Sequence, residues 1–188
     1  DVERSRGLGD VYKRQVRDFI AKTQFVELGL EERVSGSPLE TREEILGKVV
    51  DKCTQNIISE LDKEGKILLV VNSFSQAEVV ATHLSANLIK RGCKEEVCAL
   101  VSDRSIDKGE PDRYIRRGEV YKFDKKKARI LVAPALAIER GHNIVDEQGH
   151  SSLSSVFFLI RPMGVPDDVK EKSIKMNGYM ATKMYEYK

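Results

Sequence analysis

The chain has 188 residues, which is enough for one domain with a hydrophobic core. Hydrophobic residues make up 40% and charged residues 33%, a composition typical of globular proteins rather than of disordered or membrane proteins. The net charge of +2 excludes a uniformly basic coat for nucleic acid, but it leaves room for a local basic face. No apolar run approaches the ~20 residues that span a bilayer, so we expect no membrane partner.

The three cysteines are Cys53, Cys93 and Cys98. An odd and sparse set argues against a disulfide framework and fits a reducing compartment, so we expect a cytoplasmic protein. Cys93 and Cys98 are not spaced like a zinc pair, and the histidines do not supply partners at the usual intervals. We therefore expect buried thiols and no metal site.

The first residues do not lead into any periodic pattern. DVYKRQ, residues 10–15, is encoded by the DNA string GATGTGTATAAGAGACAG, which matches the mosaic end of a transposon used to make sequencing libraries. We therefore expect residues 1–15 to be a translated adaptor, the alternative being a flexible basic N-terminus. Residues 16–38 are expected to form a connector and residues 39–188 a domain, with a C-terminal end that is a candidate for truncation.

The elements predicted along the chain alternate between helix and strand. Apolar residues at three- and four-residue steps predict helices, and unbroken apolar runs predict strands buried on both faces. Thr41 and Glu44 are spaced to form a capping box. The predicted helices cover residues 41–61, 76–91, 135–139 and 169–185. The predicted strands cover residues 67–71, 97–101, 130–133 and 156–160.

This alternation predicts an α/β fold, a parallel sheet with helices on both faces. Ligands of such sheets bind at the carboxyl ends of the strands, so polar residues that follow a strand are the first candidates for a site. No G-x-G-x-x-G follows a strand, and no G-x-x-x-x-G-K-[ST] is present, which argues against a dinucleotide site and a self-sufficient phosphate loop. The acidic stretch 146–150 does not follow a buried strand, and we interpret it as a polar loop.

Three segments carry a specific resemblance. KILLVVNSFSQAEVVATHL (66–84) resembles the opening of a helicase C-terminal domain, GEVYKFDKKKARILVAPALAIERGHNIV (118–145) resembles the segment with helicase motif V, and SSVFFLIRP (154–162) resembles the strand that follows. Their order and spacing agree over about half of the chain, and the motif V segment is the most specific. The chain is thus similar to the second RecA-like domain of superfamily 2 helicases. The RGHNI and IRPM-x-VPDD stretches resemble large helicase-like ATPases of bacterial defence systems.

The resemblance implies two stacked RecA-like domains, with ATP in the cleft between them and DNA or RNA across their top. The missing N-terminal RecA-like domain would carry the phosphate loop and the acids that hold Mg²⁺. Residues 39–188 would then form the second motor domain, and this fragment would have no ATPase activity alone. The alternative function is a catalytically degenerate RecA-like module that holds nucleic acid or acts as a scaffold.

Residues that follow three of the predicted strands are candidates for contact with the nucleic-acid backbone, and the resemblance singles out Ser73 and the motif V position among them. Asn72 and Ser73 follow the first strand and Ser102 follows the second. A hydroxyl beside free helix N–H groups suits a phosphate, although Ser73 as a plain N-cap needs the same residue, and both interpretations stay open. Pro134 and Ala135 stand where motif V often has a threonine, so only main-chain contact is expected there.

The resemblance assigns the ATP site to motif V and to the last predicted strand. Arg140 and Gly141 match the Arg-Gly of motif V, with Arg140 a candidate catalytic group beside the transferring phosphate, or else a structural salt bridge. Asn143 stands where many relatives carry an aspartate that meets the ribose or the neighbouring motif, and asparagine can still form a hydrogen bond but brings no charge. Motif VI is not matched: no arginine follows Arg161. Either Arg161 acts as the finger, or the finger lies beyond Lys188, or hydrolysis is not activated in the usual way.

Two basic stretches are further candidates for a phosphate path. One holds Arg113, Arg116 and Arg117, with Tyr114 interleaved, and the other is Lys125 to Lys127. Charge runs are more often solvated loops, and we favour that interpretation for both stretches.

Overall fold

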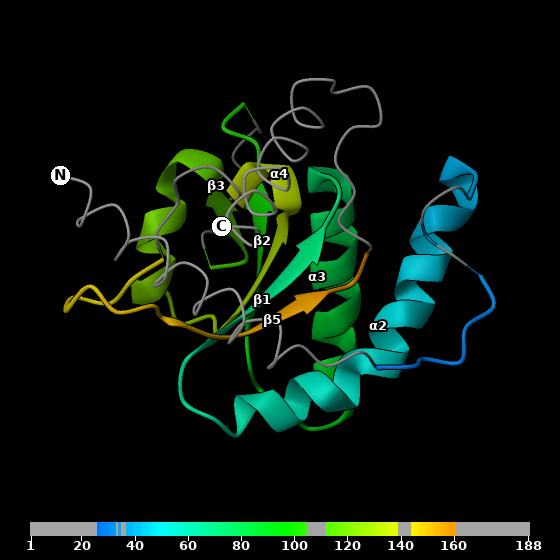
Figure 1. The fold of residues 1–188 in the computed structure, drawn as a ribbon, viewed down its shortest axis with the longest axis horizontal. Coiled ribbons are helices and arrows are strands. Elements are labelled where there is room, and N and C mark those ends of the chain that lie inside the picture. Colours follow the sequence, from blue (N-terminus) through cyan, green and yellow to red (C-terminus); the bar gives the residue numbers. More distant parts are fainter. Residues whose placement is uncertain (1–25, 33, 35–36, 105–111, 139–143, 161–188) are drawn as a thin grey trace, which may run out of the picture.

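The structure is a computed structural model, and it describes residues 26–32, 34, 37–104, 112–138 and 144–160 of the chain (Figure 1). Helices and strands alternate over most of this range. In chain order they are α2 (Leu39–Leu61), β1 (Lys66–Val71), α3 (Phe74–Lys90), β2 (Val97–Val101), β3 (Tyr114–Arg116), the 3₁₀ helix η1 (Arg117–Lys125), β4 (Ile130–Pro134), α4 (Ala135–Ile138) and β5 (Leu153–Phe158).

The strands form one five-stranded sheet in the order β3-β2-β4-β1-β5, and every neighbouring pair is parallel. Ile130 of β4 stands opposite Ile67 of β1 on one side and Val97 of β2 on the other. Because β1, β2 and β4 are aligned in this way, they also end at the same level. The predicted α/β fold with a parallel sheet is confirmed.

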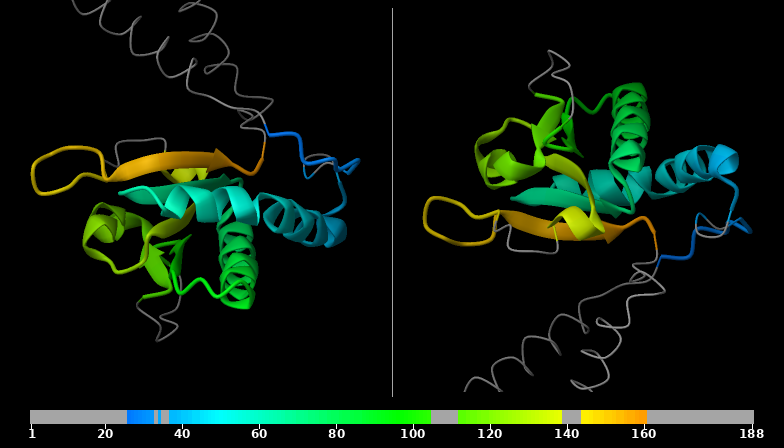
Figure 2. Two further views of the ribbon diagram at one scale, coloured as in Figure 1. Left: turned by 90° about the horizontal axis from the view of Figure 1, so that it is seen from below. Right: turned by 90° about the horizontal axis from the view of Figure 1, so that it is seen from above.

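Helices cover both faces of the sheet, as predicted (Figure 2). The face that presents Ile67, Leu69 and Val71 packs against α2 and α3. The opposite face, which presents Leu68 and Val70, packs against η1 and α4. In a strand buried on both faces, every side chain lies in the core, so apolar and polar residues do not alternate along it. This explains why β1, β2 and β4 are continuous apolar runs in the sequence.

The N-terminus of α2 differs from the prediction. Its N-cap is Pro38, which offers no side-chain hydrogen bond, and the Thr41 hydroxyl donates to the Pro38 carbonyl at 3.1 Å. The predicted capping box of Thr41 and Glu44 is therefore wrong, because the helix begins two residues earlier and Thr41 already lies within its first turn. The fixed backbone angle of proline suits this position at the entry to a helix.

The C-terminal end of α2 is held to the sheet by Arg129. Its guanidinium donates to the carbonyl of Leu61 at 2.8 Å and to that of Gly65 at 3.0 Å, so it satisfies acceptors that a helix end leaves open. Gly65 has φ +104°, and a Cβ at this position would lie 2.8 Å from the Cβ of Ser154 in β5. A glycine is thus required where the chain turns from α2 into β1.

The remaining predicted elements have different outcomes. The last strand covers 153–158 rather than 156–160, and its exposure alternates along the chain because β5 lies at the edge of the described sheet. β3 was not predicted, since three residues between polar stretches give no apolar run. The stretch 146–150 is a turn closed by a bridge between Val145 and Ser151, which confirms the predicted loop. The predicted tail at 169–185 lies outside the described residues.

The buried thiols were predicted correctly for two of the three cysteines. Cys53 packs in α2 and Cys98 in β2, whereas Cys93 is half-buried. Burial raises the pKa of Cys53 to about 11 and that of Cys98 to about 12, since a thiolate is disfavoured away from water. Among the helices that the structure describes, none is long and apolar enough to cross a membrane.

Candidate functional site

The carboxyl ends of all five parallel strands lie at one edge of the sheet, which we call the carboxyl edge, and β1 to β4 carry the candidate residues described below. Val71, the last residue of β1, stands opposite Pro134, the last residue of β4. Val101, the last residue of β2, stands opposite Arg116, the last residue of β3. Because all four strands run in the same direction, the residues that follow them emerge side by side along this edge.

The candidate residues described by the structure are brought together at the carboxyl edge. Asn72 and Ser73 follow β1, Ala135 follows β4, and Ser102 follows β2. Neighbouring strands are ~4.8 Å apart, so Ser102 and Asn72 lie roughly 10 Å apart along the edge, two strand spacings. Residues that are 30 positions apart in the sequence thus emerge along one edge of the sheet.

Ser73 is the N-cap of α3, so the structural role is confirmed. Its backbone is extended and its Oγ accepts a hydrogen bond from the N–H of Gln76 at 3.2 Å. The Gln76 side chain returns the contact, with its Oε1 accepting from the N–H of Asn72 at 3.0 Å. Ser73 is exposed, and a hydroxyl that accepts one hydrogen bond can still donate its own hydrogen. The capping role therefore leaves the hydroxyl proton available to an anion.

The loop after β2 is tied to the start of η1. The Ser102 Oγ accepts from the N–H of Arg104 at 3.3 Å, which bends the chain directly after the strand. The Asp103 Oδ1 accepts from the N–H of Gly118 at 2.8 Å. A Cβ at Gly118 would lie 3.3 Å from that oxygen, so the close approach favours glycine. This contact holds the loops that follow β2 and β3 together.

The position that resembles motif V is only partly accessible. Pro134 is buried in the sheet, whereas Ala135 is half-buried at the start of α4. Pro134 also lacks an N–H, so the main-chain contact expected from this pair falls to Ala135 and the carbonyl of Pro134. The other residues assigned to the ATP site, Arg140, Gly141, Asn143 and Arg161, lie outside the described residues.

The structure separates the two basic stretches. Arg116 and Arg117 lie at the carboxyl edge, where β3 ends and η1 begins. Lys125 to Lys127 lie at the opposite edge, because the Nζ of Lys66, the first residue of β1, donates to the carbonyls of Lys126 at 2.7 Å and Ala128 at 2.9 Å. The two stretches therefore do not form one phosphate path, which the sequence alone left undecided.

A hollow of about 450 Å³ lies at this opposite edge, beside the amino ends of β1, β4 and β5. Both of its cations make structural contacts: Arg129 binds the end of α2, and Lys66 donates to carbonyls and lies 4.7 Å from the centre of the Phe123 ring. Burial lowers the pKa of Lys66, and carboxylates of Asp124 and Asp146 share the lining. The hollow thus has mixed charge and is far from the carboxyl edge.

A polar cluster between α2 and α3 was missed in the sequence, because it joins residues more than 30 positions apart. Asp51 Oδ1 lies 2.8 Å from Nε2 of His83 and accepts from the Asn87 amide at 2.7 Å. Periodicity marks both helices, but it cannot show which polar positions face each other across them. The described residues hold no group of three or more His, Cys, Asp or Glu side chains suited to a metal ion.

The chain has no significant match among protein-family models, curated proteins or solved structures. The resemblance to helicases therefore depends on the three sequence segments, and what is established is an α/β protein with a five-stranded parallel sheet.

Proposed function

We propose that the chain is the second motor domain of an ATP-dependent helicase or nucleic-acid translocase of superfamily 2. The observation that carries this proposal is the placement of Asn72, Ser73, Ser102 and Ala135 along one edge. These residues follow three separate strands, and the resemblance nominates Ser73 and the motif V position at Ala135 among them for contact with a nucleic-acid backbone. They emerge together at the edge where parallel α/β sheets bind their ligands.

The chemistry of this edge suits a phosphate backbone. The Ser73 hydroxyl can donate to a phosphate oxygen while it caps α3, and the first turn of that helix carries positive partial charge. Phosphate contacts of this kind position a strand without reading its sequence. A translocase needs such contacts because it must hold every sequence that it passes over.

The ATP site would be shared with a preceding RecA-like domain, which would hold the phosphates and Mg²⁺. Arg140 of this chain would stabilise the charge that develops on the transferring phosphate, an effect worth up to roughly 10³-fold or more for an arginine finger. Gly141 would allow the loop to approach the nucleotide, and Asn143 would offer a hydrogen bond without charge.

The test is the ATPase activity of the longer protein with and without single-stranded DNA or RNA. We expect nucleic acid to stimulate hydrolysis and Arg140→Ala to abolish the stimulated rate. The present chain alone should not hydrolyse ATP, because it has no phosphate loop. Turnover by this chain alone would exclude the proposal.

A catalytically degenerate RecA-like module is the second candidate, and the absence of any arginine after Arg161 favours it. Such a module would bind nucleic acid or a protein partner without turnover. The same assay separates the two candidates: a longer protein that binds nucleic acid but has no stimulated ATPase activity would be the scaffold.

A further inference from the structure

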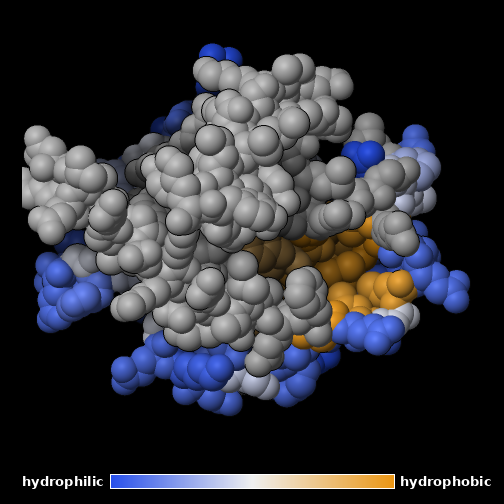
Figure 3. All heavy atoms as spheres, in the orientation of Figure 1, coloured by the Kyte–Doolittle hydropathy of each residue, from blue (hydrophilic) through white to orange (hydrophobic). Residues whose placement is uncertain are grey.

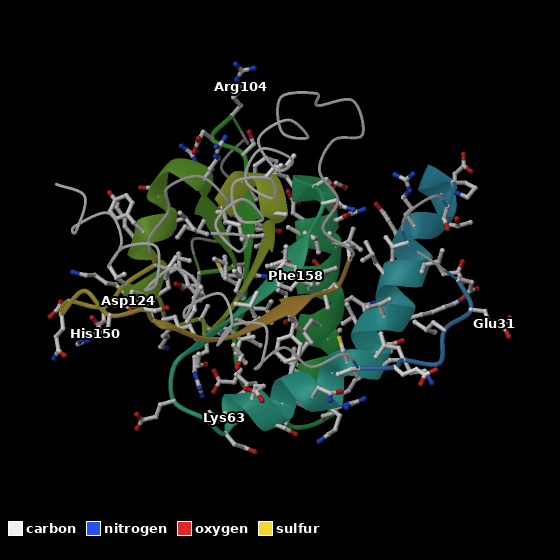
Figure 4. The ribbon with its side chains drawn as sticks, in the orientation of Figure 1. Glu31, Lys63, Arg104, Asp124, His150 and Phe158 are labelled. Carbon is white, nitrogen blue, oxygen red and sulfur yellow. The ribbon has the colours of Figure 1, made fainter. Side chains whose placement is uncertain are left out.

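Three arginines gather at the β3 end of the carboxyl edge. Arg116 is the last residue of β3, Arg117 is the first residue of η1, and Arg104 is two residues beyond Ser102. Arg104 and Arg116 are exposed, and Figure 4 shows Arg104 extending from the body of the protein at this edge. The hydrogen bond between Asp103 and Gly118 joins the two loops that carry them. We call these three residues the arginine cluster.

Two nearby carboxylates, those of Glu119 and Asp103, are engaged with other groups. Glu119 lies 2.7 Å from the ammonium of Lys122, and this hydrogen bond lowers the pKa of Glu119. Asp103 accepts from a backbone N–H. In the described part of the chain, no ion pair links a carboxylate to a member of the arginine cluster within 4.0 Å. Among the described residues, the cluster therefore presents two exposed arginines and the half-buried Arg117 without a close ion pair, although the charge of Arg116 helps to lower the pKa of Glu119.

The cluster and Ser73 lie on one line. The strand order places β3, β2, β4 and β1 side by side, so roughly 14 Å separate the end of β3 from the end of β1. Ser102 lies between the two ends. A line of cations and hydroxyls of this length fits a few consecutive phosphates of one extended strand.

We propose that the arginine cluster binds the phosphate backbone of a single nucleic-acid strand that runs along the carboxyl edge toward Ser73. The proposal rests on the proposed function and adds the residues that supply its charge. Guanidinium groups suit this role because they pair with phosphate oxygens through two N–H donors and remain charged. Lys125 to Lys127 lie at the far edge and take no part.

The test is the salt dependence of binding of the 188-residue chain to a labelled oligodeoxythymidine, measured by fluorescence anisotropy. The first variant replaces Arg104, Arg116 and Arg117 by Gln. The matched control replaces Lys125, Lys126 and Lys127 by Gln, which removes the same charge from the opposite edge. Thermal melting of both variants shows that each is folded.

Each phosphate contact with a single strand contributes about 0.7 to the slope of log affinity against log salt. The arginine variant should therefore lose about 2 from this slope. A slope difference of about 2 has a simple consequence when salt rises from 50 to 200 mM. The factor by which the affinity of the unmodified chain falls should be about 20 times the factor for the arginine variant. The lysine variant should keep the slope of the unmodified chain.

Two results would overturn the proposal: unchanged slopes in both variants, or equal losses in both. In either case binding by the unmodified chain would leave the proposed function standing. If the unmodified chain did not bind the oligonucleotide at all, the arginine proposal and the nucleic-acid half of the proposed function would fall together.

Discussion

At the residue scale, Ser73 has two separable roles. It caps α3 through Gln76, and we propose that its hydroxyl also contacts phosphate. Ser73→Ala should lower the free energy of unfolding by about 1 kcal/mol, because the helix loses its cap. Ser73→Asp keeps a good cap, so stability should be retained, but its charge would repel a phosphate. Chemical denaturation and oligonucleotide binding measure the two effects.

The aspartate variant decides between these roles. We expect it to unfold like the unmodified chain and to bind nucleic acid several-fold more weakly. If it bound nucleic acid as tightly as the unmodified chain does, Ser73 would be a cap alone.

The thiols give a second prediction at this scale. Cys53 and Cys98 are buried, with pKa values raised to about 11 and about 12, so neither should react with iodoacetamide at about pH 8. Cys93 is half-buried and should react. Mass spectrometry should find one alkylated thiol in the native chain and all three after denaturation. Rapid native labelling of Cys98 would contradict the placement of β2 in the core.

Residue roles could be predicted where they depend on near neighbours in the sequence. Ser73 was recognised as a candidate cap because a strand, a polar turn and a helix follow one another within a few residues. The contact between Asp51 and His83 could not be found, because it depends on how two helices face each other. The role of Arg129 at the end of α2 could not be predicted from the sequence either, because 68 positions separate it from Leu61.

At the scale of elements, the turn from α2 into β1 depends on Gly65. Its positive φ would strain any other residue, and an added Cβ would meet the Cβ of Ser154 at 2.8 Å. Gly92 is a matched control, because it also has a positive φ, of +73°, but has open space around it. We expect Gly92→Ala to lower the free energy of unfolding by about 1–2 kcal/mol.

Gly65→Ala should lower the free energy of unfolding by roughly 1–3 kcal/mol more than Gly92→Ala does, because the clash with Ser154 adds to the backbone strain. Urea denaturation of the two variants measures the difference. Equal losses would mean that β5 does not approach the α2–β1 turn as closely as described.

The packing of α2 on α3 gives a pH-dependent prediction. Hydrogen bonds, first from Asn87 and then from His83, lower the pKa of Asp51 below its usual value of 3.8. Because the folded pKa is depressed, Asp51 stabilises the fold above about pH 4 and loses this contribution as the pH falls through its folded pKa. The melting temperature of the unmodified chain should therefore exceed that of Asp51→Asn near neutral pH. The two should converge in strong acid, well below pH 3.8, where Asp51 is protonated and its charge is lost.

A constant difference between the two melting curves at every pH would contradict this role for the charge of Asp51. Asp51 is largely exposed, so the effect should be small and should weaken as salt is added.

Elements could be predicted where burial on both faces produces a clear apolar run. β1, β2 and β4 were placed to within a residue or two for this reason. β5 was shifted, because at the sheet edge its exposure alternates and only its apolar end stands out. β3 was missed, because its three residues are held by pairing with β2 rather than by a pattern of their own.

At the scale of the whole molecule, the sequence predicted the parallel sheet but not the order of its strands. That order decides which distant residues meet at the carboxyl edge. Because β3 pairs with β2, Arg116 and Arg117 lie beside Ser102 at the carboxyl edge. Lys125 to Lys127 lie at the opposite edge, although only a few residues separate the two stretches in the chain. The candidate residues could thus be named from the sequence, but which of them lie side by side could not be predicted.

We propose that this chain supplies half of an ATP-dependent motor. Long-read sequencing of the source DNA across this locus tests it most directly. We predict that the open reading frame continues upstream of Val16 into a domain with a G-x-x-x-x-G-K-[ST] phosphate loop and an acidic box at a strand end. A genuine start codon followed by native sequence at this point would contradict the motor and leave a solitary binding module.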